Sequence, residues 1–467
     1  MCGFRCCVCV AVVFIASRGG VFAAEPLRAG IAVVDVTPPV PFRMSGYFNE
    51  RLSTGTKDPL HAKAVVFQQG DVSAALVFCD MVGISREVSS AARRQASEAT
   101  GIPADHIAIA ATHSHTGPLY FGALHDHFHD RNVERAGADP YDTADYRAEL
   151  VKQIVAAIVQ AKSSAQPSEL STGLAHEDRL SFNRRFHMKD GSVRFNPGEL
   201  NPNIVRAAGP IDPGVGIILL SPPKSSANPA AAIVAFALHL DTVGGTQYSA
   251  DYPKFVEDRL REAFGSQFTF LFAAGTCGDI NHIDVKTRDR RSTESIGTML
   301  GETVQQAIAE PNLLSPSEPA LAVRSVKVDA PLQSYSESEI ADARQNMDLI
   351  GTRELSFLDQ VEAYKIVDIQ RLTGDTVPLE VQVFRLNRET VLVMLPAEVF
   401  VDLGLAIKAA SPFKTTLVIE LANDLLGYIP TRKAFAEGSY ETINSRVQPG
   451  SGERLVEAAI GLLEELE

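Results

Sequence analysis

Two histidines stand two residues apart directly after an apolar run, in the segment Thr112-His113-Ser114-His115. The run covers residues 107–111 and predicts a buried strand. Because alternate side chains of a strand point to the same side, both imidazoles can reach one point in space. Imidazole is the commonest protein ligand for zinc. The alternative is a polar turn after a buried strand, without any ligand.

Five further apolar runs also end in polar side chains that can do chemistry. They span residues 74–79, 231–238, 268–273, 391–395 and 416–419, and they lead to Asp80, His239, the segment 275–282, Glu398 and Tyr428. Short continuous apolar runs predict strands that are buried on both faces. In α/β sheets, ligands bind outside the carboxyl ends of the strands. These strand ends therefore predict one composite site.

The composition is that of an ordinary globular protein. The chain has 467 residues, of which 45% are hydrophobic and 21% are charged, so it can bury a large core. Its formal net charge is -14. An acidic chain without a basic patch argues against a nucleic-acid partner, because phosphates attract cationic surfaces.

The first residues predict a secretory signal peptide, residues 1–23, which leaves residues 24–467 as the mature protein. Arg5 gives the positive start, residues 6–16 form an apolar core too short to cross a bilayer comfortably, and residues 21–23 resemble a cleavage site. The sequence predicts no transmembrane segment elsewhere, so we expect a secreted or periplasmic protein. Cys79 and Cys277 remain after cleavage; we expect buried free thiols, with a disulfide between them as the alternative.

The pattern of apolar residues predicts the α/β class: a single large domain with a mixed, largely buried β-sheet flanked by helices and an active site at the carboxyl ends of the strands. Helices are expected at residues 86–100, 146–162, 252–264, 292–309 and 451–467, and a pair broken near Gly351 within 336–372. Further strands are expected at 320–328 and 379–395, and a long loop at 196–213.

Several motifs, in this order, resemble the catalytic domain of the neutral/alkaline non-lysosomal ceramidases. They are ATHSHTGP at 111–118, SFNRR at 181–185, AFALH at 235–239, SADYP at 249–253, CGDIN at 277–281, LPAEVF at 395–400 and GYIPT at 427–431. The resemblance runs from about residue 30 nearly to the C-terminus. The family's C-terminal immunoglobulin-like domain has no counterpart in these 467 residues.

The resemblance implies an enzyme that hydrolyses the amide bond of ceramide with one zinc ion. The ligands that it implies are His113, His239, Glu398 and Tyr428, and Arg184 stands at the place of a family arginine. Two neutral imidazoles and one carboxylate leave zinc a net positive charge and an open position for water. His115 can hold that water or the substrate oxygens, and Tyr428 can also stabilise an oxyanion.

Arg184 and His115 are the candidates to orient the polar head of the substrate, and Asp241 or Asp279 to orient the histidines. One departure from the family concerns mechanism: Asn281 stands where the family carries its proposed serine nucleophile. Because an amide cannot be acylated in this way, we expect attack by zinc-activated water without an acyl-enzyme. Asn281 either donates to the oxyanion or only closes a turn. The expected substrate is a small amphipathic N-acyl compound, with peripheral lipid contact possible and ceramide itself left open.

Two other functions remain open from the residues alone. One is a two-metal phosphoesterase that uses His113, His239, Asp80, Asp279 and Asn281; the other is a non-catalytic secreted metal-binding protein. The chain has no GxSxG or HExxH motif, which argues against a serine hydrolase elbow and a zincin. A second histidine cluster, His125, His127 and His129, predicts either a solvated loop or a metal site.

Overall fold

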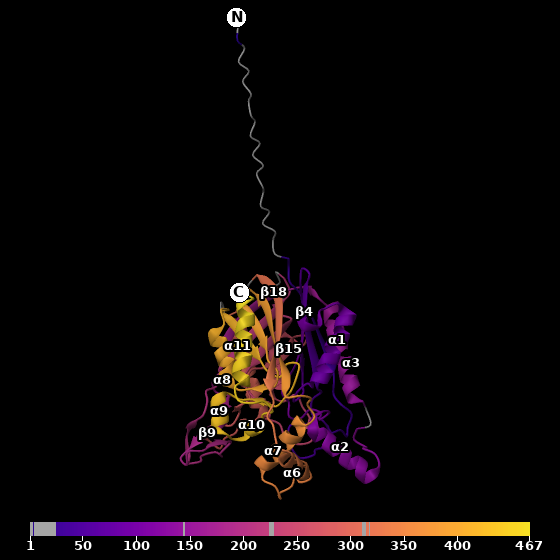
Figure 1. The fold of residues 1–467 in the computed structure, drawn as a ribbon. Helices are drawn as coiled ribbons and strands as arrows, with labels where there is room; N and C mark the ends of the chain where they lie inside the picture. Colours follow the sequence, from indigo (N-terminus) through magenta and orange to yellow (C-terminus); the bar gives the residue numbers. More distant parts are fainter. Residues whose placement is uncertain (1–2, 4–24, 143–144, 224–227, 311–313, 317) are drawn as a thin grey trace.

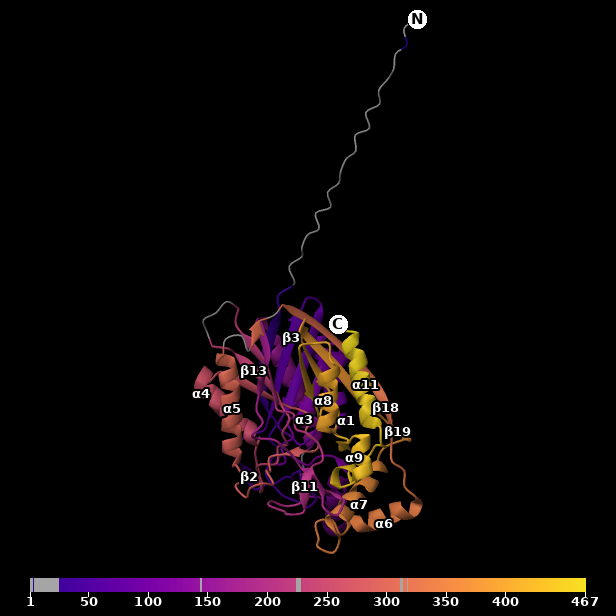
Figure 2. The ribbon, with the colours of Figure 1, turned by 90° about the vertical axis from the view of Figure 1, so that its left-hand side faces the viewer.

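Most strands of the computed structural model belong to three mixed sheets, and each sheet contains one parallel pair (Figures 1 and 2). The structure describes residues 3, 25–142, 145–223, 228–310, 314–316 and 318–467. The predicted signal peptide lies, apart from Gly3, outside these residues. Within the described part of the chain, no helix is both long and apolar enough to cross a membrane.

The first sheet contains β5, the strand that leads to His113. Its order is β5-β4-β3-β1-β6, with β4 and β5 parallel. Helices α1 and α3 pack against each other beside this sheet, and α3 lies on β1 and β3 (Figure 1). The bounds are β1 Arg28–Asp35, β3 His61–Gln69, β4 Val72–Cys79, β5 Ile107–Ala111, β6 Gln166–Pro167, α1 Arg86–Thr100 and α3 Tyr146–Ser163.

The second sheet leads to His239 and to the segment with Asn281. Its order is β15-β13-β12-β7-β17, with β13 and β15 parallel, and helices α4 and α5 cover it (Figure 2). The bounds are β7 Glu169–His176, β12 Gly214–Ser221, β13 Ala231–Phe236, β15 Thr269–Ala274, β17 Ser315–Pro316, α4 Tyr252–Phe264 and α5 Thr293–Ala309.

The third sheet leads to Glu398 and Tyr428. Its order is β18-β19-β20-β22, with β20 and β22 parallel, and helices α8 and α11 lie against it (Figure 1). The bounds are β18 Pro319–Pro331, β19 Thr376–Asn387, β20 Thr390–Met394, β22 Thr415–Ile419, α8 Val401–Ala410 and α11 Ser451–Glu464.

One hydrophobic core joins the three sheets. It contains Phe78 of the first sheet, Leu271 of the second and Leu417 of the third, all buried. Isolated bridges pair Ala110 with Ala422 and Gly275 with Ile419, which tie the ends of the sheets together. The carboxyl ends of the parallel pairs are therefore held close to one another, as a composite site requires.

Shorter elements complete the end of the molecule opposite the C-terminus, where α2, α6 and α7 lie (Figure 1). Their bounds, with those of the short strands near the site, are α2 Gly122–Ala136, α6 Glu337–Met347, α7 Phe357–Ile369, α9 Arg432–Glu437, α10 Tyr440–Ile443, β8 Phe182–Asn183, β9 Arg185–Met188, β10 Val193–Phe195, β11 Ile204–Ala207, β16 Ile280–Asn281, β21 Glu398–Val399 and β23 Tyr428–Ile429.

The α/β class and the expected helices are confirmed. Ser292 caps α5, and Ser336 forms a capping box with Glu339 at the start of α6. Three expectations need correction. The strands divide among three main sheets rather than one, the expected loop 196–213 contains β11, and the second histidine cluster lies on helix α2 rather than in a loop. Both Cys79 and Cys277 are buried free thiols.

Candidate metal centre and active site

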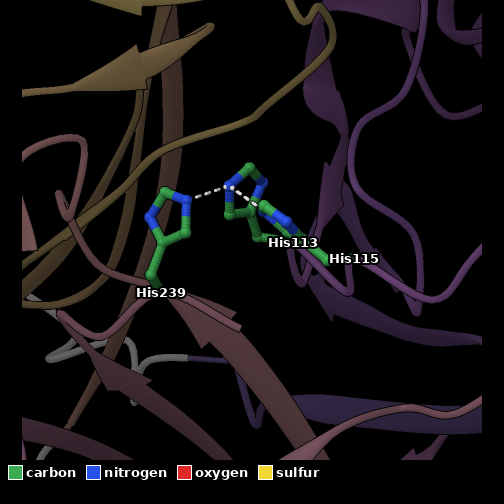
Figure 3. A group of neighbouring side chains, drawn as sticks. All are labelled: His113, His115 and His239. Carbon is green, nitrogen blue, oxygen red and sulfur yellow. Dashed lines mark hydrogen bonds between the residues drawn. The ribbon is translucent and has the colours of Figure 1, made fainter. Parts of the chain in front are cut away.

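Three imidazoles from two sheets meet at one point (Figure 3). His113 and His115 follow β5 of the first sheet, and His239 follows β13 of the second. The Nε2 atom of His113 lies 2.9 Å from Nε2 of His239 and 3.3 Å from Nε2 of His115. One ring nitrogen of each histidine lies within 4.8 Å of the other two.

The backbone fixes which nitrogen of each ring faces the cluster. His113 Nδ1 lies 2.8 Å from the carbonyl oxygen of Val82, and His239 Nδ1 lies 3.3 Å from that of Cys277. A ring that donates its Nδ1 proton to a carbonyl keeps a lone pair on Nε2. The two Nε2 lone pairs then point at each other across 2.9 Å, an arrangement that only a proton or a cation between them stabilises.

Glu398 brings a carboxylate to the same point from β21, a short strand that follows β20 of the third sheet. Its Oε2 atom lies 3.3 Å from His113 Nε2 and 3.7 Å from His239 Nε2. Among the described residues, this buried oxygen has no hydrogen-bond partner. Strand β21 pairs in parallel with β23 so that Glu398 lies opposite Tyr428. Glu398 and Tyr428 therefore lie side by side on two paired strands.

These distances fit a single zinc ion. Ligand atoms about 2.0–2.1 Å from a tetrahedral ion lie about 3.3 Å from one another, and the separations of the imidazole and carboxylate atoms are 2.9, 3.3, 3.3 and 3.7 Å. A cation would also satisfy the unpartnered oxygen of Glu398 and the facing lone pairs of His113 and His239. The family resemblance does not imply His115 as a ligand, but its Nε2 atom lies as close to His113 Nε2 as the carboxylate oxygen of Glu398 does, at 3.3 Å.

Burial and charge set the protonation states of the cluster. Burial lowers the pKa of His115 and of His239 well below the ordinary value, and the neighbouring His113 adds to the effect. Burial raises the pKa of Glu398, but His113 and Arg184 outweigh it, so that this pKa lies below its usual range. His115 and His239 are therefore neutral and Glu398 is ionised, the states in which these groups bind metals.

Arg184 lies beside the cluster and is held by several partners. Its Nη1 atom lies 3.5 Å from His239 Nε2, and its Nη2 donates to the Tyr428 hydroxyl at 3.1 Å and to the Gly278 carbonyl at 2.7 Å. The Nε atom donates to Glu441 at 2.9 Å. Although burial lowers the pKa of the guanidinium, Tyr428 and Glu441 raise it well above the ordinary value, so this cation is permanent.

The hydroxyl of Tyr428 faces Glu398 and Arg184. Burial raises the pKa of Tyr428 well above its usual value, and the charge of Glu398 adds to that effect. Without a metal the phenol is therefore neutral. It can serve as a weak metal ligand or as a hydrogen-bond donor to a developing negative charge.

Glu441 is a functional residue that the sequence analysis missed. This fully buried carboxylate accepts from Arg184 and, at 3.0 Å, from Nη1 of Arg185. It fixes Arg184 at the cluster from a helix 257 residues further along the chain. Its neighbours in the sequence form no recognisable motif, so only the tertiary structure reveals the pairing.

The two aspartates that were predicted to orient the histidines have different partners. Asp241 Oδ1 lies 3.7 Å from His115 Nδ1 and accepts from the Tyr47 hydroxyl at 2.5 Å. The carboxylate of Asp279 instead accepts from the Asn183 amide at 2.8 Å and from the backbone of Val401 at 2.9 Å. Asp241 is thus the one beside a histidine, and Asp279 ties the loop of the second sheet to α8.

Asn281 lies at the edge of the site with both ends of its amide engaged. Its Oδ1 accepts from the backbone N–H of Ile283 at 3.0 Å, and its Nδ2 donates to Asn196 at 2.9 Å. The first contact closes a turn, as one of the two hypotheses predicts. An amide nitrogen carries two protons, so Asn281 also has a donor to offer the cavity that it lines together with His239.

Two cavities meet at the cluster. The first, of about 290 Å³, is lined by His113 and Glu398 and by apolar side chains that include Leu119, Phe121, Leu124, Leu425 and Leu426. The second, of about 520 Å³, is lined by His239 and by polar groups that include Arg184, Asn196, Asp241, Asn281 and His282. Tyr47, His115 and Tyr428 line both. Charged side chains such as Arg86 and Arg371 also line the first cavity, and Phe195 and Phe357 also line the second. The first is nevertheless the more apolar cavity and the second the more polar one, and the imidazoles lie between them.

Two solved structures resemble this chain over most of its length. No family model matches the chain, and no curated protein sequence matches it. Among solved structures, neutral ceramidase from Pseudomonas aeruginosa superposes with a TM-score of 0.69 at 20% identity, over 95% of this chain and 75% of that one. A ceramidase complexed with C2 gives 0.67 at 18% identity, over 94% and 76%. The chain has the neutral ceramidase fold. The resemblance inferred from its motifs is thereby confirmed at the level of structure.

Proposed function

We propose that this protein is a secreted zinc-dependent amidohydrolase that cleaves an N-acyl, ceramide-like amide bond. The observation that carries the proposal is the meeting of His113, His239 and Glu398, from the segments that follow strands of three different sheets, at separations of 2.9–3.7 Å. Zinc would be held by these three residues and Tyr428. The fold shared with the ceramidases supports the class of reaction.

The residues around the proposed zinc have separate roles. When bound, zinc supplies a Lewis acid that polarises the amide carbonyl and makes a water molecule nucleophilic near neutral pH. His115, kept neutral by burial, would accept a hydrogen bond from that water at a ring nitrogen and so orient it. Arg184 and the Tyr428 hydroxyl, which contact each other, stabilise the negative charge that develops on the carbonyl oxygen.

The water attacks directly, without an acyl-enzyme. Asn281 occupies the position at which the family resemblance implies a serine, and an amide side chain cannot take the acyl group. Because its second amide proton is available to the polar cavity, Asn281 acts as a further donor to the tetrahedral oxyanion. This role adds to the turn that its carbonyl oxygen closes.

The two cavities indicate an amphipathic substrate. An acyl chain would lie against the leucine and phenylalanine side chains of the first cavity, and the polar part of the substrate would lie in the second, next to Arg184 and Asp241. The two-metal phosphoesterase receives no support from these contacts. Of the carboxylates it needs, Asp80 accepts from the backbone of His61 at 3.0 Å, and Asp279 is engaged by Asn183 and Val401.

The test is hydrolysis of a panel of N-acyl lipids and N-acyl amino acids by the zinc-loaded protein. We expect release of free fatty acid from at least one member, and its loss in His239→Ala. The matched control is His176→Ala, which removes an exposed histidine paired only with Asp178 in the described contacts, and which should keep full turnover. Failure of the wild-type protein to cleave any member of the panel would refute the proposal.

A further inference from the structure

A second cluster of metal-ligating side chains lies on α2 and the segment after it. The atoms His129 Nδ1, Asp139 Oδ2 and Asp142 Oδ2 all lie within 4.8 Å of one another. His129 Nδ1 is 3.0 Å from the Asp139 oxygen and 3.1 Å from the Asp142 oxygen. None of these residues lines either cavity of the proposed active site.

His125 approaches the same point from the preceding turn of the helix. Residues four apart lie on one face of a helix, and the rings of His125 and His129 are nearly parallel, with centroids 6.1 Å apart. The Nε2 atom of His125 lies 3.5 Å from Asp142 Oδ2. The third histidine of the motif, His127, contacts the ring of Phe128 instead. The helical spacing thus places His125 and His129 at the cluster, but not His127.

A second layer of contacts orients these groups. Asp126 Oδ1 lies 3.0 Å from Nδ1 of His125, and the other oxygen of Asp126 pairs with Arg371 at 2.8 Å. A carboxylate on Nδ1 leaves the lone pair of His125 on Nε2, toward Asp142, as in carboxylate–histidine–metal arrangements. Arg43 donates to both oxygens of Asp139, including the Oδ2 atom beside His129, and offsets the charge of Asp139. Asp142, which contacts both His125 and His129, supplies the second carboxylate.

We propose that His125, His129, Asp142 and Asp139 form a second binding site, for one divalent transition metal ion of the zinc type. The separations of 3.0, 3.1 and 3.5 Å match the value of about 3.3 Å expected around tetrahedral zinc. The ligands are two imidazoles and two carboxylate oxygens, a set that suits zinc better than calcium or magnesium.

The ion would join the middle of α2 to the segment 137–142. Leu124 of the same helix lines the apolar cavity, so the ion would steady one wall of that cavity without touching the substrate. The competing explanation is that His125 and His129 are protonated and pair with the aspartates without any metal.

The test measures zinc binding in a protein whose first site has been removed. In His113→Ala/His239→Ala, equilibrium dialysis against zinc should still give about one ion per chain. Adding His129→Ala, or Asp142→Asn, should abolish this binding. Adding His127→Ala removes a histidine from the same helix but not from the cluster, and should leave the binding unchanged. Thermal melting without metal checks that each variant is folded.

Two results would overturn the proposal. One is the absence of zinc binding in the folded His113→Ala/His239→Ala protein. The other is full zinc binding after His129→Ala and after Asp142→Asn. Amide hydrolysis separates this inference from the proposed function, because His129→Ala made alone in the wild-type chain should leave turnover unchanged. A loss of turnover in His239→Ala would still support the first site if the second site failed.

Discussion

At the scale of single residues, the arrangement around Arg184 decides what the imidazole cluster can do. In the proposed mechanism, this buried cation beside the neutral imidazole of His239 and the neutral phenol of Tyr428 would stabilise an oxyanion without having to reorganise. Glu441 holds the guanidinium in place and balances its charge, so the cation can remain buried. The sequence analysis identified Arg184 from its motif but not Glu441, because a pairing across 257 residues leaves no local pattern.

Replacing Arg184 by lysine should lower kcat about 100-fold, because lysine cannot reach Glu441, Tyr428 and the oxyanion together. Steady-state kinetics on the best N-acyl substrate gives kcat and KM. The matched control is Arg194→Lys, an exposed arginine paired with Asp190, which should change neither constant. Unchanged kcat in Arg184→Lys would remove this residue from the mechanism.

The two roles of Asn281 are separable by substitution. Asn281→Asp keeps the oxygen that accepts from Ile283 but removes the amide donor, whereas Asn281→Ala removes both. If Asn281 donates to the oxyanion, both variants should lose at least about tenfold in turnover, and Asn281→Ser should not exceed the wild type. Full turnover in Asn281→Asp would assign Asn281 to the turn alone.

At the scale of elements, the short connections after the strands place the ligands in unusual backbone conformations. His113 has φ of 80° and Ala397, directly before Glu398, has φ of 68°. Non-glycine residues rarely adopt this region, and they do so where the surrounding structure enforces it. The backbone N–H of His113 bonds to the Met81 carbonyl at 2.8 Å, and that of Ala397 to Asp424 at 3.0 Å, which enforces both conformations.

Ala397 therefore tolerates glycine but not a β-branched residue. Ala397→Gly should keep zinc and turnover, because glycine adopts a positive φ without strain. Ala397→Val should lose most turnover and about 2 kcal/mol of unfolding free energy, because a branched side chain at positive φ clashes with the backbone. Urea unfolding and the N-acyl assay measure both effects. Equal behaviour of the two variants would contradict the strained backbone.

Element boundaries were the part of the fold most accessible from the sequence. Apolar spacing predicted the helices within 292–309 and 336–372, where α5 and α6 begin after the capping residues Ser292 and Ser336, and unbroken apolar runs predicted the buried strands. The prediction of a loop around His127 was wrong, because the alternation of histidines and acidic residues hid the helical spacing of the buried Leu124 and Phe128. Two-residue strands such as β21 and β23, which place Glu398 beside Tyr428, leave no periodic signal.

At the scale of the whole molecule, the proposed zinc would connect all three sheets. His113 follows a strand of the first sheet, His239 a strand of the second and Glu398 a strand of the third. The shared core packs these sheets together. The convergence of strand ends could be predicted from the sequence. The division of strands into three sheets could not, because apolar runs show which strands are buried but not which strands pair.

Removal of the metal should therefore lower the stability of the whole fold. A ligand that binds only the folded state stabilises it, so a chelator should lower the melting temperature, and zinc should restore it. Histidine ligands must be neutral, and burial keeps the pKa of His239, one of the proposed ligands, well below 6.5. Zinc bound at the cluster should thus be retained as pH falls through 6.5 and be released only in more acidic solution. Release above about pH 7 would contradict this assignment.

The most direct measurement is the return of turnover when zinc is added back to chelator-treated protein. The account predicts that the metal-free protein releases no fatty acid from its N-acyl substrate. Turnover should then rise with added zinc to the level of untreated protein, and it should not return in His113→Ala or Glu398→Gln. A metal-free protein that cleaves the substrate as fast as the zinc-loaded one would contradict the account.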